Sequence, residues 1–363
     1  MTTRAGRRLT IADVARAAGV STGAVSYALN GKPGVSEATR ARVIQVAGEL
    51  GWRPHSAARS LSVARTGTVG LVLARPASTL GDESFYMQLI TGIEAELAQQ
   101  GTGLLLQMVP SEDACVEVYR RWVAQGRVDG VLVSDIVHDD PRPAFLREAG
   151  LPAVAMGGDA ALGLPRVVGD DERAVQQVVA HLAELGHRHV ARVSGLPGLL
   201  HVRLRDEAFT AAARSAGLHP QLVSTDFTAR ASRRATERLL QRRVRPTAVV
   251  YDNDVMAVAG LAVVQAHGLR VPQEVALVAW DDSALCSLVH PRLTAVARDI
   301  RGLGALAARR LLRLLAEGDS GADAGAGAGD EAEAQVAAAA DVPAPASRLV
   351  VRESTSASPP ETR

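Results

Sequence analysis

Charged and aromatic side chains gather at the ends of predicted strands and near the start of two predicted helices. Each carboxylate accepts hydrogen bonds from two hydroxyl groups, a guanidinium donates in a fixed fork, and an aromatic ring covers an apolar face. These groups together suit a neutral polyhydroxylated small molecule. The candidate ligand-binding residues are Phe85, Tyr86, Asp170, Arg205, Phe227, Asn253, Asp254 and Asp281. For Asp170 and Asp281 the alternative role is structural, as helix caps or as ion pairs between two lobes of the fold.

A second group of polar side chains lies near the N-terminus, in a basic part of the chain. Hydroxyl and amide groups of this kind contact phosphates and fix register without reading sequence; here they are Thr10, Ser21, Ser26, Asn30 and Ser36. Residues 1–65 hold ten Arg and Lys against three Asp and Glu, which gives +7 and leaves −6 for the remainder of a chain of net charge +1. A basic head on an acidic body indicates a polyanion partner at one end only. A merely solvated basic terminus is the alternative.

Residues 9–29 predict two short helices joined by a tight turn. Thr10, with Asp13 as its acidic partner, and Ser21 are the expected N-caps, and Gly19 is the expected left-handed C-cap. Such a pair forms the helix-turn-helix unit whose second helix enters the DNA major groove, although an ordinary helical hairpin of an enzyme has the same pattern. The predicted inward positions, including those of a third helix over about 37–50, are Ile11, Val14, Ala15, Ala18, Val25, Ala28, Leu29, Val43, Ile44, Ala47 and Leu50.

From residue 68 the pattern changes to alternating strands and helices, which predicts parallel sheets covered by helices on both faces. Strands are expected at 69–74, 103–109, 129–134, 152–157, 166–169, 189–194, 221–225, 248–252, 275–281, 294–299 and 348–353. Helices are expected at about 85–100, 112–125, 143–149, 172–185, 203–216, 230–242, 254–267 and 300–317. Residues 319–346 are rich in Gly, Ala and acid and predict a disordered insertion, because they cannot bury enough apolar surface.

Several other sites are not expected. Cys115 and Cys286 lack metal or redox spacing and are interpreted as ordinary buried thiols, and the histidines at 181, 187 and 189 do not form a metal cluster. The first predicted strand is not followed by a glycine-rich phosphate loop, which argues against a Rossmann-type enzyme. We therefore expect no catalytic residue, metal or cofactor. Neither a secretory signal nor an apolar run of ~18 residues is present, so we expect a cytoplasmic protein without a membrane span.

The remaining motifs follow one another in a fixed order. They are TIADVARAAGVSTGAVSYALNG, PGVSEATRARV, ELGWRP, AARSL, TGTVGLV, GHRHVARVSG, DNDVMAVAG, RVPQEVALVAWDD, HPRLTAV and RLVVRES. Over nearly its whole length the chain resembles the LacI/GalR family of bacterial transcription regulators. The resemblance implies an α/β fold with an all-α helix-turn-helix head, a hinge helix and a two-lobed body of the periplasmic-binding-protein type I, with parallel sheets.

The same resemblance assigns roles to individual residues. Thr22, Gly23 and Tyr27 occupy the positions that contact base edges, and Arg205 matches the family arginine four residues before a phenylalanine. In the hinge, Ala57, Ala58 and Leu61 carry the resemblance, with Leu61 expected to enter the minor groove as an apolar wedge. Packing within a linker is the alternative role for Leu61.

These observations predict the division of the chain. A disordered arm (1–8), a DNA-binding head (9–53) and a hinge (54–66) precede an effector-binding and dimerisation body (67–353), and a loose tail (354–363) follows it. Lobe one is expected over about 67–164 and 292–318, and lobe two over about 165–291 and 347–353. The expected function is a homodimeric repressor of a palindromic operator, controlled by a small molecule, with a sugar favoured. The alternatives are an extracytoplasmic sugar-binding transport protein and a purine- or nucleoside-responsive regulator of the same family.

Overall fold

The computed structural model describes residues 9–29, 33–52, 65–76, 81, 83–323 and 341–356, except the side chains of 319–323. The chain divides into two compact units, residues 1–67 and 68–363, which are described separately. The predicted arm 1–8, the hinge residues 53–64 and the C-terminal residues 357–363 lie outside the described residues.

The first unit contains three helices, α1 (Ile11–Ala18), α2 (Thr22–Leu29) and α3 (Glu37–Glu49). The Asp13 carboxylate accepts hydrogen bonds from the backbone N–H and the hydroxyl of Thr10, and Gly19 ends α1 in the left-handed conformation at φ 66°. Ser21 accepts from the N–H of Ala24 at 3.1 Å, so the turn between α1 and α2 has the predicted caps.

The core of this unit confirms most of the predicted inward positions. Val14, Val25 and Val43 are fully buried, and small residues beside them let the three helices approach. The prediction for Ile44 is wrong, because its side chain is 54% exposed. Ile44 follows Val43 directly, and consecutive helical residues point about 100° apart. Trp52, just beyond α3, fills the core instead.

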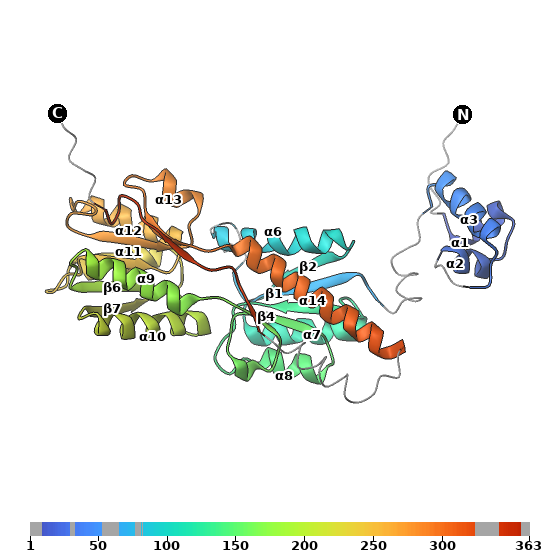
Figure 1. Cartoon of the computed structure of the whole chain (residues 1–363), viewed down its shortest axis with the longest axis horizontal. Helices are drawn as coiled ribbons and strands as arrows, with labels where there is room; N and C mark the ends of the chain where they lie inside the picture. The colour runs from blue at the N-terminus through green and yellow to red at the C-terminus, as the bar shows by residue number, and fades with distance from the viewer. Residues whose placement is uncertain are drawn as a thin grey trace. The chain divides into compact units, whose positions relative to one another are not determined.

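The second unit is built on two six-stranded sheets (Figure 1). The first sheet has the order β11-β5-β4-β3-β1-β2, with every adjacent pair parallel. Its strands are β1 (Thr68–Leu73), β2 (Gly103–Met108), β3 (Gly130–Val133), β4 (Ala153–Met156), β5 (Arg166–Val168) and β11 (Val342–Pro343). Its helices are α6 (Ser84–Gln99), α7 (Glu112–Gln125), α8 (Pro141–Glu148) and α14 (Ile300–Asp323), with a short 3₁₀ turn at Ala160–Leu162.

The second sheet has the order β12-β10-β9-β8-β6-β7, in which only β12 runs antiparallel to its neighbour. Its strands are β6 (His189–Ser194), β7 (His219–Ser224), β8 (Ala248–Tyr251), β9 (Ala276–Trp280), β10 (Thr294–Ala297) and β12 (Arg348–Val350). Its helices are α9 (Asp171–Glu184), α10 (Leu200–Ser215), α11 (Ala229–Leu240), α12 (Asp254–Ala266) and α13 (Ala284–Leu288). The central strands are buried on both faces, which explains their continuous apolar runs.

The chain passes between the two sheets three times, and two of the predicted lobe boundaries are wrong. β5 was expected in lobe two but pairs with β4 in the first sheet, and β10 was expected in lobe one but pairs with β9 in the second. The chain therefore crosses after β5, after β10 and between β11 and β12. An apolar run predicts a strand but not its hydrogen-bonding partner, so the pattern alone does not locate these crossings.

The predicted insertion 319–346 is wrong at both ends. α14 continues to Asp323, and Val342–Pro343 forms β11 at the edge of β5. Asp341 is paired with the largely buried Arg166, and the N–H of Ala344 donates to the carbonyl of Val168 at 2.8 Å. Polar contacts therefore fix this end of the segment, whereas the prediction from composition considered only the burial of apolar side chains. Residues 324–340 lie outside the described residues.

The predicted loose tail is also wrong at its start. Ser354 and Thr355 are buried, and the Ser354 hydroxyl donates to the carbonyl of Leu277 at 2.6 Å and accepts from the N–H of Thr294 at 2.8 Å. Thr355 lies within hydrogen-bond distance of Thr294 and His181. Small hydroxyl residues thus close the edge beside β10. Among the helices described, none is long and apolar enough to cross a membrane.

α6 and α14 lie side by side in the lobe built on the first sheet (Figure 1). Their close approach depends on glycine. A Cβ at Gly304 would overlap the carbonyl oxygen of Leu89 and lie 3.1 Å from the N of Ile93, both backbone atoms of α6.

We expect Gly304→Ala to lower the free energy of unfolding by about 1–3 kcal/mol. Gly318 in the same helix faces open space, so Gly318→Ala should be neutral or stabilising by up to about 1 kcal/mol. Urea unfolding of both variants tests this, and equal midpoints would contradict it.

Candidate functional site

A pocket lies between the two sheets, at the carboxyl ends of the strands, where open α/β sheets bind ligands. Its walls come from residues that follow β1, β3, β4 and β5 in the first sheet and β7, β8, β9 and β10 in the second, together with the starts of α6 and α10. All three crossings contribute to it, through Gly169, Arg298 and Ala344 among others. Movement at the crossings therefore changes the pocket directly.

The structure brings six of the eight predicted ligand residues into the pocket wall. They are Phe85, Tyr86, Arg205, Phe227, Asn253 and Asp281. Asp254 is buried next to the wall, where it accepts from the Ser84 hydroxyl of the other lobe at 3.4 Å. Asp170 lies outside the wall, and its carboxylate accepts from the N–H of Ser347 at 3.0 Å. Asp170 thus joins the first crossing to the third. Within the described part of the chain its carboxylate neither caps α9 nor forms an ion pair, so neither of the alternatives given for it describes this contact.

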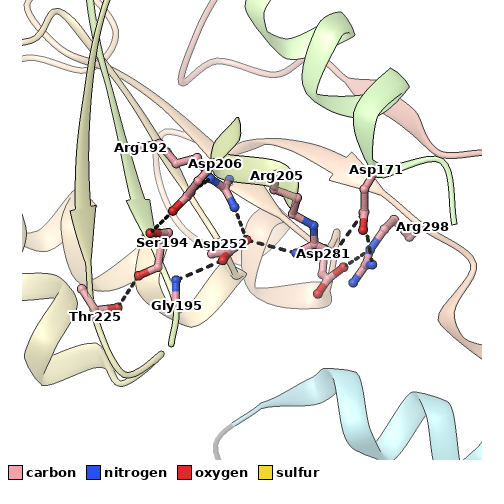
Figure 2. A network of polar contacts seen from close by, with 10 residues as sticks. All are labelled: Asp171, Arg192, Ser194, Gly195, Arg205, Asp206, Thr225, Asp252, Asp281 and Arg298. Atoms are coloured by element: carbon pink, nitrogen blue, oxygen red, sulfur yellow. Dashed lines mark hydrogen bonds and ion pairs between the residues drawn. The ribbon is translucent and has the colours of Figure 1, made fainter. Parts of the chain in front are cut away.

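Asp252 is a residue of the candidate site that the sequence analysis missed, and several of the polar contacts in Figure 2 involve its carboxylate. Its fully buried carboxylate accepts from Arg192 at 2.6 Å, from Arg205 at 3.0 Å and from the N–H of Gly195 at 3.0 Å. Burial alone would raise the pKa of Asp252, but the guanidiniums of Arg192 and Arg205 hold it well below its ordinary value. The carboxylate is therefore charged at any physiological pH.

Arg205 is held on a second side by another missed residue, Asp171, at 3.0 Å (Figure 2). Its guanidinium also lies over the ring of Trp280, 4.7 Å from the centroid. Arg192, behind it, pairs with Asp206 at 2.7 Å. With two carboxylates and a ring around it, Arg205 presents a fixed donor to the pocket.

Two further arginines touch the predicted aromatic residues. Arg75 follows β1 in the first sheet and lies over the ring of Phe227, 5.3 Å from its centroid, in the other lobe. Arg298 lies 5.5 Å from the centroid of Phe85 and bonds the Asp281 carboxylate at 2.7 Å. One face of each phenylalanine is thus covered by a guanidinium, and the lobes are connected across the pocket.

The backbone is strained at three residues of the pocket wall. Asp135, Phe227 and Asp281 have φ of 51°, 68° and 65°, in the left-handed region that favours glycine. Among described residues, only one other non-glycine residue, Asp139, has positive φ. Such strain costs of order 1–3 kcal/mol per residue and clusters at functional sites.

Three buried polar atoms of the wall have no hydrogen-bond partner within the described part of the chain. They are the Ser134 Oγ, the Arg205 Nε and the Asn253 Nδ2. The two nitrogens are donors, and an unpaired buried donor costs about 1–3 kcal/mol. An oxygen-rich ligand, or water, would satisfy them. For the residues the structure covers, no group of three or more His, Cys, Asp or Glu could hold a metal ion.

The head forms a second candidate site, on the exposed face of α2. Thr22 and Gly23 are exposed and the Tyr27 side chain is 46% exposed, with its ring packed on Gly34. Ser26 is half-buried on the same helix, and Thr10, Ser21 and Ser36 are exposed at the helix starts, where Ser21 and Ser36 also act as caps. The predicted contacts Asn30, Ala58 and Leu61 lie outside the described residues. α2 itself carries no charged side chain, so hydroxyl and methyl groups are what it offers to base edges.

Comparison with known proteins gives consistent matches to both units. Residues 10–55 match the bacterial regulatory proteins of the lacI family, and residues 179–355 match the periplasmic binding protein-like domain. The HTH-type transcriptional regulator CelR of Thermobifida fusca is 36% identical over 86% of this chain and 92% of its own length. A solved complex of CelR with cellobiose is 31% identical, with a TM-score of 0.68 over 96% of this chain and all of that one. The lac repressor dimer bound to operator and the anti-inducer ONPF is 25% identical, with a TM-score of 0.81 over 96% of this chain and 99% of that one.

The Glu83 carboxyl at the start of α6 gives the site a pH-dependent stability. Burial raises its pKa from 4.5 to about 8, Asp135, Asp281 and Asp254 add to the increase, and Arg75 opposes it. Between these two pH values the native state holds a proton that the unfolded chain has lost, so the free energy of unfolding falls as pH rises.

We expect the melting temperature of Glu83→Gln to rise above that of the wild type progressively as the pH increases from 5 to 8. Glu94→Gln, at an exposed site of the same helix, is the control, and parallel pH profiles for wild type and Glu83→Gln would contradict the expectation.

Proposed function

Because the chain belongs to the LacI family of bacterial regulatory proteins, we propose that it represses a palindromic operator as a homodimer under the control of a small sugar. It is a DNA-binding transcriptional regulator and not an enzyme. A transport protein of similar fold would not carry the helix-turn-helix head, so that alternative is rejected. Because its DNA target is the bacterial chromosome, we assign the protein to the cytoplasm.

The observation that carries the proposed control is the pocket around Arg205, in the same chain as a DNA-binding head. Its donor is fixed by Asp171 and Asp252, and unpaired buried donors lie nearby. Carboxylates, a guanidinium and phenylalanine rings are the groups that hold a polyhydroxylated ligand. The relative CelR in complex with cellobiose supports a sugar. We assign effector binding to Phe85, Tyr86, Arg205, Phe227, Asn253 and Asp281, with Asp171 and Asp252 as positioning residues.

We assign operator contacts to Thr22, Gly23 and Tyr27 for base edges and to Thr10, Ser21, Ser26, Asn30 and Ser36 for phosphates. The proposed hinge, with Ala58 and Leu61, folds on the operator, as the resemblance implies. Ligand then acts by changing the arrangement of the lobes and hence the free energy of folding two hinges together. A coupling of about 1–3 kcal/mol is ordinary for such a switch.

Operator binding should depend steeply on salt. The head carries +7, and each phosphate contact releases counterions, so the logarithm of the affinity should fall linearly with the logarithm of the salt concentration. Fluorescence anisotropy with a palindromic operator and a scrambled duplex of equal length measures this. A flat salt profile, or equal affinity for both duplexes, would contradict a specific operator.

Replacing Arg205 should separate ligand response from DNA binding. Loss of one charge-assisted donor costs about 1.5–3 kcal/mol, so Arg205→Ala should bind cellobiose or another responsive sugar about 10- to 100-fold more weakly. Operator affinity without ligand should change little. Isothermal titration calorimetry and anisotropy give the two values.

A matched control lies on the same helix. Arg203 is exposed and outside this pocket, so Arg203→Ala should bind ligand like the wild type. Arg205→Lys keeps the charge beside Asp171 and Asp252 if the alanine variant is unstable, because removing one partner of a buried ion pair costs about 3–5 kcal/mol. Unchanged ligand affinity in both Arg205 variants would make Arg205 a structural residue.

A further inference from the structure

The charged groups of the pocket wall are not matched one to one. The wall holds the guanidiniums of Arg75, Arg205 and Arg298 and six carboxyl groups. One of these, Asp252, is also paired with Arg192 behind the wall, and another, Glu83, holds a proton below about pH 8. Each guanidinium is already paired, with Asp135 at 3.3 Å, with Asp171 and Asp252 at 3.0 Å, and with Asp281 at 2.7 Å. His201 adds no positive charge, because burial lowers its pKa to about 4. Within the described wall, an anionic ligand therefore meets no unpaired cation.

Glu83 is the wall carboxylate that has no partner of its own. It is the N-cap residue of α6 but accepts no capping hydrogen bond, and among the described residues it forms neither a hydrogen bond nor an ion pair. The sixth carboxylate, Asp299, accepts from the N–H of Gly302 at 2.8 Å. The charged groups with the largest influence on the pKa of Glu83 are Arg75, which lowers it, and Asp135, Asp281 and Asp254, which raise it. The Arg75 guanidinium is itself bonded to Asp135.

We propose that Glu83 sets the charge selectivity of the pocket, so that it favours an amino sugar over its neutral counterpart and rejects a sugar phosphate. This inference rests on the proposed function, since it names the class of sugar for the same pocket. An ammonium group beside Glu83 supplies the partner that this carboxyl group lacks among the described residues. If the amine is already protonated, Glu83 releases its proton to solvent on binding; if the amine is neutral, it takes the proton that Glu83 holds. The complex then holds a carboxylate and an ammonium in both cases.

The neutral parts of such a ligand use the remaining wall. Its hydroxyl oxygens accept from the Asn253 amide and the Arg205 guanidinium, and its apolar face lies against Phe85 or Phe227. These contacts are common to neutral and amino sugars. The difference between the two classes is therefore expected to depend chiefly on Glu83.

The test compares sugars that share a skeleton and differ in charge. Isothermal titration calorimetry of the full chain at pH 7.5 uses two sets: glucose, glucosamine and glucose 6-phosphate, and cellobiose with the β-1,4-linked dimer of glucosamine. We expect each amino sugar to bind at least tenfold more tightly than its neutral counterpart, and the phosphate at least tenfold more weakly. In Glu83→Gln the preference for the amino sugar should fall below threefold, with neutral sugars changed less than threefold.

Glu94→Gln, on the exposed side of α6, is the matched control and should keep the wild-type ranking. A phosphate that binds as tightly as the neutral sugar, or a ranking unchanged in Glu83→Gln, overturns the inference. If cellobiose binds and shifts operator affinity without any ranking by charge, the inference fails and the proposed function stands. If no sugar of the panel binds, both fail.

Discussion

The buried carboxylate of Asp252 is the contact on which most of the second lobe's binding surface depends. It accepts from two guanidiniums and from the N–H of Gly195, and thus joins the ends of β6 and β8 to the first turns of α10 (Figure 2). Gly195 in turn has no room for a Cβ, because the Phe227 ring occupies that space. One carboxylate therefore sets the position of Arg205 and, through Gly195, the position of the Phe227 ring. Such a buried cluster of charges is compatible with a stable fold only when every charge is paired, because a buried unpaired charge lowers the free energy of unfolding.

The three crossings give this arrangement its second constraint. Asp170 bonds Ser347 and thus joins the first crossing to the third, while Arg166 of β5 pairs with Asp341 beside β11 and fixes the strands from which these two crossings leave the first sheet. The second crossing contributes Arg298, which holds Asp281 and lies over Phe85. A change in the angle between the lobes has to pass through segments that also form the pocket wall. Ligand contacts and lobe geometry are thus coupled locally.

Much of this was predictable from the sequence because its signals are local. Caps at Thr10, Ser21 and Gly19 depend on residues within one turn, and the buried strands have unbroken apolar runs. The expectation that site residues follow the ends of strands also found the right loops, but it did not find every residue in them. It selected Asp170, which lies outside the wall, and missed Asp171; it selected Asn253, which lies in the wall, and missed its neighbour Asp252. Which of two adjacent side chains points inward depends on where the following helix begins, within one residue. Applied to β1, β3 and β10, the same rule would have indicated Arg75, Asp135 and Arg298.

The strained residues could not have been predicted, because their conformation is imposed by contacts between distant segments. Asp135 bonds Arg75, the Phe227 ring lies under the same guanidinium, and Asp281 bonds Arg298. Each left-handed residue is thus held by an arginine from a different part of the sequence. A ligand that takes over one of these arginines removes what holds the strained conformation. The strain of each, of order 1–3 kcal/mol, is the same size as an ordinary allosteric coupling energy.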